Sequence, residues 1–83
     1  PVYLSLDIDC LDPAFAPGTG TPEPGGLSSA QLFSWLEALA TLPLVGMDCV
    51  EVAPPYDHAE LTSYVAAQAV WTVLCGQRAR PET

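Results

Sequence analysis

SLDIDCLDP, residues 5–13, is the stretch that decides the fold. It completes an apolar run that predicts a β-strand, in which successive side chains point to opposite faces. Asp7 and Asp9 should therefore project side by side, while Leu6 and Ile8 point into the packed interior. Pro13 stops the strand because proline cannot donate to the ladder of hydrogen bonds. The pattern predicts two carboxylates at the carboxyl end of a strand, the edge where open parallel sheets build their sites.

These two carboxylates have two interpretations from spacing alone. Side chains two residues apart on a strand lie about 7 Å apart, and two negative charges at that distance repel unless a cation lies between them. Hard oxygen ligands favour Mg, Ca or Mn over zinc. A solvated turn or an Asx cap is the alternative interpretation.

The remaining chain predicts an α/β domain in the order β-α-β-α. Residues 2–9 form the first strand, and residues 12–26 are a loop rich in proline and glycine that is typical of a linker or a functional loop. A helix follows and ends at Pro43, residues 44–52 form the second strand, and a second helix runs to Gly76. This order implies a right-handed crossover and parallel strand pairing. Residues 77–83 read as a polar, frayed tail.

Local signals mark the helix ends. Ser28 and Gln31 predict a capping box for the first helix, and Asp57 predicts the cap of the second. Gly76 is typical of a helix C-terminus. Trp35 shares the apolar stripe of the first helix, which indicates a core position.

Composition excludes several function classes. The 83 residues carry a formal net charge of −8, which argues against nucleic acid and anionic membranes as partners and is compatible with a cationic substrate. Three cysteines, an odd number inside apolar runs, predict buried reduced thiols in a reducing compartment. No apolar run is long enough to cross a bilayer. The chain starts at Pro1 directly before a strand, so we expect it to be the C-terminal piece of a longer protein.

Two motifs carry a family resemblance. The first runs from Ser5 through Asp-x-Asp-x-x-Asp-Pro to the loop Pro-Gly-Thr-Gly-Thr-Pro at residues 17–22. The second is Val-Glu-Val-Ala-Pro-Pro-Tyr-Asp at residues 50–57. Together they resemble the ureohydrolase family of arginase, agmatinase and relatives, over residues 2–76. The stretches at residues 23–26 and 54–58 look like agmatinase-type sequences.

This resemblance implies a fold, a cofactor and a reaction. The fold would be a three-layer arginase-like parallel sheet, of which residues 1–76 form the C-terminal portion. The whole protein would be a manganese-dependent amidinohydrolase, with two ions in the complete site, that converts an agmatine-like guanidino compound to urea and an amine. Asp7 and Asp9 resemble metal ligands. Glu51 resembles the glutamate that pairs with the guanidinium group, and Thr21 resembles a loop threonine near the substrate.

Other polar residues have structural interpretations. Asp48 alternates to a different face from Glu51 and predicts a structural partner. Asp12 fits a turn, and His58 fits a helix start. The family's further histidine and aspartate ligands and its proton-transfer histidine lie elsewhere, so these 83 residues alone should be inactive.

Alternatives to agmatine hydrolysis stay open at this stage. A guanidinobutyrate or other guanidino-acid hydrolase differs only in substrate. A non-catalytic binding or scaffold paralogue and a small metal-binding regulatory module are the rivals of another class. Joint presence of Asp7, Asp9 and Glu51 argues against the paralogue. The family resemblance also implies a homo-oligomer, and we expect it in the cytoplasm.

Overall fold

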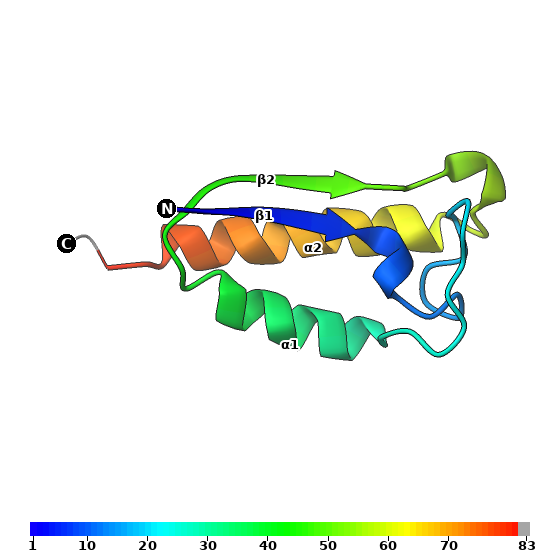
Figure 1. The fold of residues 1–83 in the computed structure, drawn as a ribbon, viewed down its shortest axis with the longest axis horizontal. Coiled ribbons are helices and arrows are strands. Elements are labelled where there is room, and N and C mark those ends of the chain that lie inside the picture. The colour runs from blue at the N-terminus through cyan, green and yellow to red at the C-terminus, as the bar shows by residue number, and fades with distance from the viewer. Residues whose placement is uncertain (82–83) are drawn as a thin grey trace.

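The computed structural model describes residues 1–81. Two parallel strands alternate with two helices in the order β1, α1, β2, α2 (Figure 1). Their bounds are Val2–Asp7, Ser29–Leu39, Leu44–Val50 and Leu61–Arg78, and two 3₁₀ turns, η1 and η2, span Ile8–Cys10 and Pro54–Tyr56. The predicted order of elements and the parallel pairing are both confirmed.

The sheet buries one face and leaves the other bare within residues 1–81. Leu6 pairs with Cys49 across the two strands, and both pack into the core that the helices cover. On the opposite face Ser5 pairs with Asp48, and the two side chains are hydrogen-bonded at 2.7 Å. The described residues therefore supply two layers, sheet and helices, of the predicted three-layer α/β architecture.

A single core joins the sheet, the helices and the loop after β1. Its buried members are Leu6, Ile8, Leu11, Ala16, Leu32, Leu36, Ala69 and Val73. Leu11 directly precedes the proline-rich segment and Ala16 lies within it, so apolar anchors hold the start of that segment in the core. Its composition is typical of a linker, but the structure shows a packed loop.

The prediction that residues 2–9 form one strand is wrong at its end. The carboxylate of Asp7 accepts a hydrogen bond from the backbone N–H of Asp9, and this contact caps the turn η1. Asp9 therefore leaves the pleat, and the argument that alternation places Asp7 and Asp9 on one face fails. The second strand likewise ends at Val50, two residues earlier than predicted.

Two burial predictions also need correction. Trp35 is 62% exposed, because the buried side chains of α1 form a narrower row, Leu32 and Leu36, that continues to Ala40 just after the helix. Cys75 is exposed on the outer side of α2, and the other two cysteines are only half-buried. All three are free thiols, as predicted.

Hydrogen bonds at the helix starts confirm one predicted cap and relocate the other. Ser28 and Gln31 form the complete capping box of α1. Helix α2 begins at Leu61, after Glu60 in the left-handed region, rather than next to Asp57. Asp57 nevertheless accepts from backbone N–H groups in the first turn of α2, so it caps the helix from outside it.

The end of α2 lies beyond the predicted stop. Gly76 is a helical residue, not a cap, and the helix continues to Arg78. The side chain of Gln77 donates to the carbonyls of Ala40 and Leu42, at 2.7 and 2.8 Å, which ties α2 to the end of α1. Residues 82–83 of the predicted tail lie outside the described residues. Neither helix in residues 1–81 combines the length and apolar character that crossing a membrane requires.

Gly76 allows α1 and α2 to approach closely, and this contact gives a testable prediction. A Cβ at Gly76 would overlap the Cβ of Ala40. Helix propensity alone favours alanine by about 1 kcal/mol, whereas overpacking costs about 1 to 3 kcal/mol. We expect Gly76→Ala to lower the free energy of unfolding, measured by chemical denaturation. Adding Ala40→Gly should restore part of the loss, and a more stable Gly76→Ala single variant would contradict the prediction.

Candidate active site at the strand ends

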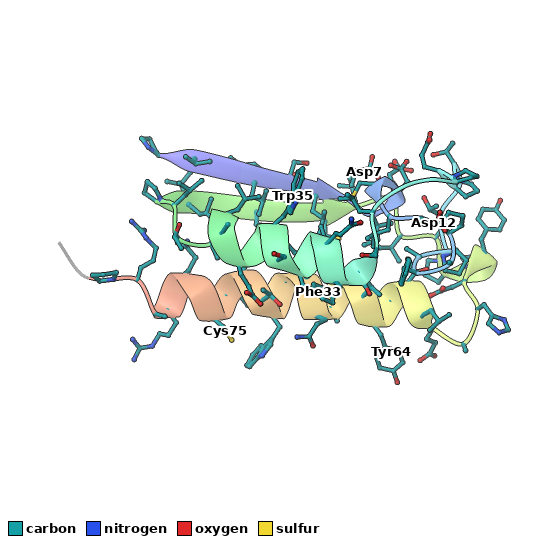
Figure 2. The ribbon with its side chains drawn as sticks, turned by 90° about the horizontal axis from the view of Figure 1, so that it is seen from below. Asp7, Asp12, Phe33, Trp35, Tyr64 and Cys75 are labelled. Atoms are coloured by element: carbon teal, nitrogen blue, oxygen red, sulfur yellow. The ribbon has the colours of Figure 1, made fainter. Side chains whose placement is uncertain are left out.

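The carboxyl ends of β1 and β2 meet at one edge of the sheet. Asp7 pairs with Val50, so Glu51 comes one residue after the partner of Asp7. Figure 2 places Asp7 and Asp12 at this end of the molecule, where both helices also begin. Helix N-termini carry partial positive charge, which favours carboxylates nearby. The strand ends thus gather acidic residues from separate parts of the chain. We call Asp7, Asp9, Thr21 and Glu51 the strand-end site.

Glu51 has a strained backbone. Its φ is 72°, in the left-handed region that residues with a Cβ seldom adopt. This conformation turns the chain out of β2 immediately after Val50. Such strain in a non-glycine residue is typical of positions where the side chain is needed. No pattern in the sequence reveals it.

Asp7 and Asp9 each use one carboxylate oxygen for local structure. Oδ1 of Asp7 accepts from the N–H of Asp9 at 3.1 Å. Oδ2 of Asp9 accepts from the hydroxyl of Thr21 at 2.9 Å. Within residues 1–81 the second oxygen of each carboxylate has no hydrogen bond, so it is available to a ligand.

Thr21 joins the loop to the carboxylate pair. Its hydroxyl donates to Asp9 across twelve residues of sequence. This contact places Thr21 beside a predicted metal ligand, whereas the family resemblance implies a position near the substrate. The hydrogen bond orients the Asp9 carboxylate, as partners of metal ligands commonly do.

Asp12 closes the proline-rich loop, as the turn interpretation predicts. Its two oxygens accept from the N–H groups of Ala14 and Gly25, at 2.8 and 2.9 Å. These hydrogen bonds lower the pKa of Asp12 below its ordinary value, and the bond from Ala14 contributes most. Asp12 N also donates to the carbonyl of Leu27, so the two ends of the loop are held together.

The remaining candidate residues have structural partners. Asp48 accepts from the hydroxyls of Tyr3 and Ser5, at 3.1 and 2.7 Å, which confirms its predicted structural role. The hydrogen bond to Asp48 is the main reason that the pKa of Tyr3 is raised. His58 is exposed, and its backbone N–H donates to Asp57 at the approach to α2.

Cysteine chemistry is unfavourable at this edge. Burial, and then the charges of Asp7 and Asp9, raise the pKa of the Cys10 thiol. Burial and the charge of Asp48 likewise raise that of Cys49. Both groups are protonated thiols near neutral pH, which are poor nucleophiles.

The donor set fits part of a cation site. Carboxylate oxygens are the ligands that Mg, Ca and Mn prefer, and Asp7 and Asp9 each offer a free one. Residues 1–81 contain no group of three or more His, Cys, Asp or Glu side chains placed to hold a metal ion. Two carboxylates alone do not make a complete ligand set for such a cation, so a site here would need further ligands.

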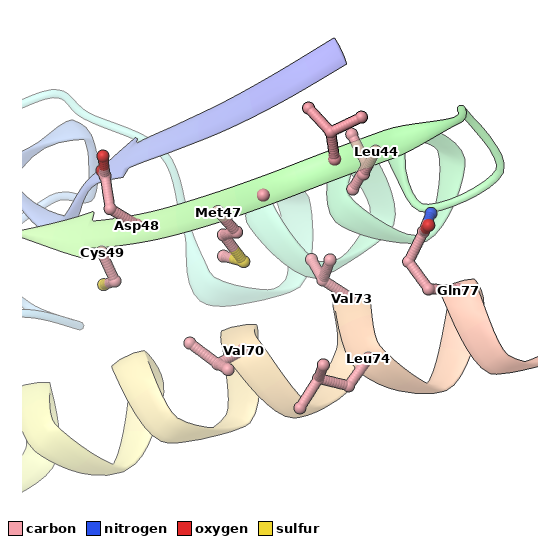
Figure 3. Close-up of a pocket in the computed structure, with 10 residues that line it drawn as sticks. Leu44, Met47, Asp48, Cys49, Val70, Val73, Leu74 and Gln77 are labelled. Carbon is pink, nitrogen blue, oxygen red and sulfur yellow. The ribbon is translucent and has the colours of Figure 1, made fainter. Parts of the chain in front are cut away.

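A groove of about 380 Å³ runs along β2 and α2 (Figure 3). Its lining is mostly apolar and consists of residues 44–49 with Val70, Val73, Leu74 and Gln77. No residue of the strand-end site lines it. The strand-end site is an open edge within the described residues rather than an enclosed pocket.

Sequence reasoning missed the contacts that hold the middle of the loop. Gly18 donates to the buried hydroxyl of Thr62 and accepts from the N–H of Ala53, both at 2.7 Å. Thr19 beside it is 3% exposed, and within residues 1–81 its hydroxyl has no partner. These hydrogen bonds join positions more than thirty residues apart, and no local sequence pattern predicts them.

Comparisons with known proteins agree on one family. The Arginase family model matches residues 1–76. Agmatinase of Chromobacterium violaceum is 55% identical over 78 residues, which cover 94% of this chain and 24% of that protein. The crystal structure of a hypothetical agmatinase from Burkholderia thailandensis superposes with a TM-score of 0.90 at 56% identity, over 94% of this chain and 25% of that one.

A third relative has another substrate in its name. Proclavaminate amidino hydrolase from Streptomyces clavuligerus superposes with a TM-score of 0.86 at 50% identity, over 99% of this chain and 27% of that one. The chain thus spans about a quarter of the length of the relatives it matches.

The strain at Glu51 predicts a measurable difference between two variants. Glycine adopts a positive φ without steric cost, while alanine retains the clash of its Cβ. We expect Glu51→Gly to have a free energy of unfolding about 1 kcal/mol higher than Glu51→Ala, measured by denaturant titration. Equal stability of the two variants would show that the backbone is not strained here.

The contact between Thr21 and Asp9 predicts an effect on cation binding. Thr21→Val removes the hydroxyl, and loss of such a partner typically weakens metal binding about 10- to 100-fold. Titration of the whole protein with Mn²⁺ by calorimetry measures the change. Thr21→Ser keeps the hydroxyl and should bind close to wild type. Identical affinities for the valine and serine variants would disprove the orienting role.

Proposed function

This chain belongs to the arginase family, and we propose that its whole protein hydrolyses an agmatine-like guanidino compound to urea and an amine. The observation that carries the proposal is the 55% identity to agmatinase across the segment that contains Asp7, Asp9, Thr21 and Glu51. Family membership supports a hydrolase of the ureohydrolase kind. Agmatine as substrate and manganese as cofactor are the finer parts of our proposal.

Charge supports a cationic substrate. The guanidinium group is planar and positive, and a carboxylate matches it with two parallel hydrogen bonds. Glu51 would supply that carboxylate next to the end of β1. Holding the guanidinium carbon in a fixed place converts a bimolecular attack into an oriented one. The strained φ of Glu51 favours this role, since relief of the strain would require moving the side chain.

The reaction adds water across a carbon–nitrogen bond. The oxygen of water bonds to the guanidinium carbon, the bond from that carbon to the alkylated nitrogen breaks, and the departing amine takes a proton. Asp7 and Asp9 would hold manganese through their free oxygens, while Thr21 keeps the Asp9 carboxylate in place. A bound divalent cation supplies hydroxide near neutral pH by lowering the pKa of water.

Agmatine has a specific alternative as the proposed substrate. A relative 50% identical to this chain is named for hydrolysis of an amidino group on proclavaminate, a substrate other than agmatine. We propose that residues 1–81 contact the guanidino group, which leaves the rest of the substrate to be recognised by other parts of the whole protein. Guanidino acids such as guanidinobutyrate are therefore the matched comparison. We also propose that the protein acts in the cytoplasm as a homo-oligomer.

Urea release from agmatine by the whole protein, with and without Mn²⁺, tests the proposal. Asp7→Asn and Asp9→Asn should each lower the manganese-dependent rate by more than about 100-fold, because each removes a ligand charge. Asp48→Asn is the matched control, since the hydrogen bonds of Asp48 go to Tyr3 and Ser5 and not to the strand-end site within the described residues. It should leave the rate near wild type.

Glu51→Gln separates substrate binding from metal binding. It should keep manganese bound while kcat/KM falls about 10- to 100-fold, the worth of a hydrogen bond to a charged group. Faster turnover of guanidinobutyrate than of agmatine would redirect the proposal to guanidino acids. Retention of metal with no urea from any guanidino compound would identify a non-catalytic relative and refute it.

A further inference from the structure

Gly18 is the point where the site loop meets the rest of the molecule. Its N–H donates to the hydroxyl of Thr62 in the first turn of α2, and its carbonyl accepts from the N–H of Ala53, which lies between β2 and η2. Both bonds measure 2.7 Å. Thr62 is fully buried, so its contact with Gly18 is shielded from water. One residue therefore joins three segments.

Asp57 packs directly over Gly18. A Cβ built on Gly18 would lie 2.7 Å from both Cβ and Cγ of Asp57, so only glycine fits beneath this side chain. The Asp57 carboxylate accepts from the N–H groups of His58 and Thr62 at 3.0 Å and of Ser63 at 3.1 Å. Asp57 thus fixes the first turn of α2, and that turn carries the hydroxyl that holds Gly18.

The electrostatics agree with this geometry. Desolvation acts to raise the pKa of Asp57, but the hydroxyl and N–H of Thr62 and the N–H groups of Ser63 and His58 outweigh it. The pKa falls to about 2. The carboxylate is therefore charged throughout the neutral range, and a charged acceptor forms the stronger hydrogen bonds.

Both sides of the strand-end site depend on Gly18. Thr21, which orients Asp9, lies three residues after Gly18. Glu51 lies two residues before Ala53, the other partner of Gly18. We propose that Asp57 and Thr62 are positioning residues that set the distance between the loop at residues 17–21 and the Glu51 segment, without touching substrate. This role rests on the proposed function, because it concerns the placement of groups for that reaction.

A matched pair of substitutions at Thr62 tests the role. Thr62→Val keeps the shape but leaves the N–H of Gly18 buried without an acceptor, and Thr62→Ser restores the hydroxyl. In the whole protein we expect Thr62→Val to lower kcat for urea release about 10- to 100-fold with manganese content unchanged, because small misplacements of reacting groups are costly. Thr62→Ser should return kcat close to wild type, and the pH profile should not move.

Ser28→Ala serves as the control for lost stability. It removes the cap of α1, the counterpart of the α2 cap that Asp57→Asn weakens, but it lies outside the contacts of Gly18. Ser28→Ala should lower the melting temperature and leave kcat unchanged, whereas Asp57→Asn should lower both. Unchanged kcat in both Thr62→Val and Asp57→Asn, at a temperature where each is folded, would overturn the proposal.

Amide hydrogen exchange provides a readout that does not need activity. In Thr62→Val the amides of residues 18–21 and of Ala53 should exchange faster than in wild type, with α1 unaffected. If wild type releases no urea, the proposed function fails, and this exchange pattern still decides whether Thr62 holds the two segments together. Wild-type exchange rates in Thr62→Val would reject the positioning role even in an active enzyme.

Discussion

Parallel pairing of β1 with β2 is the constraint on which the rest of the structure depends. Because both strands run the same way, their carboxyl ends share one edge, and Asp7 faces Val50 there. An antiparallel pair would have placed Glu51 at the opposite end from Asp7. The crossover helix α1 makes this pairing possible, since parallel strands need a long connection. The same geometry brings the N-termini of both helices to the end of the molecule where the strands end (Figure 1). Their partial positive charge there offsets some of the repulsion between the carboxylates.

The five aspartates divide into two kinds by what their carboxylate oxygens contact. Asp12, Asp48 and Asp57 accept hydrogen bonds through both oxygens, so they are structural acceptors. Asp7 and Asp9 each keep one oxygen free within the described residues. Among the five aspartates, this division singles out the two that have a carboxylate oxygen left for a cation. The spacing of the five aspartates in the sequence cannot predict this division, because it depends on which hydrogen-bond donors the fold brings to each carboxylate.

How far the sequence predicts the fold depends on whether the signal is local. The capping box at Ser28, the parallel order of elements and the structural role of Asp48 follow from short patterns, and the structure confirms them. The predicted end of β1 is wrong because the Asp7 carboxylate accepts a hydrogen bond from the N–H of Asp9, and this bond replaces the extended strand conformation with a turn. The prediction that Trp35 is buried is wrong because the spacing of apolar residues along a helix does not show how much of that helix face the rest of the protein covers. The link from Gly18 to Thr62 spans 44 residues and has no local signal.

Two glycines of this chain are needed where another element approaches the backbone closely, rather than for backbone flexibility. Gly18 and Gly76 both stand where a Cβ would collide with a neighbouring element, Asp57 in one case and Ala40 in the other. Neither has a positive φ, so their importance is the absence of a side chain. A loop with many prolines and glycines is usually taken for a linker, yet prolines restrict its backbone and Gly18 lets it dock against α2. Two features that suggest mobility in a sequence thus combine here to hold Thr21 at a fixed distance from the end of β2, which an oriented reaction requires.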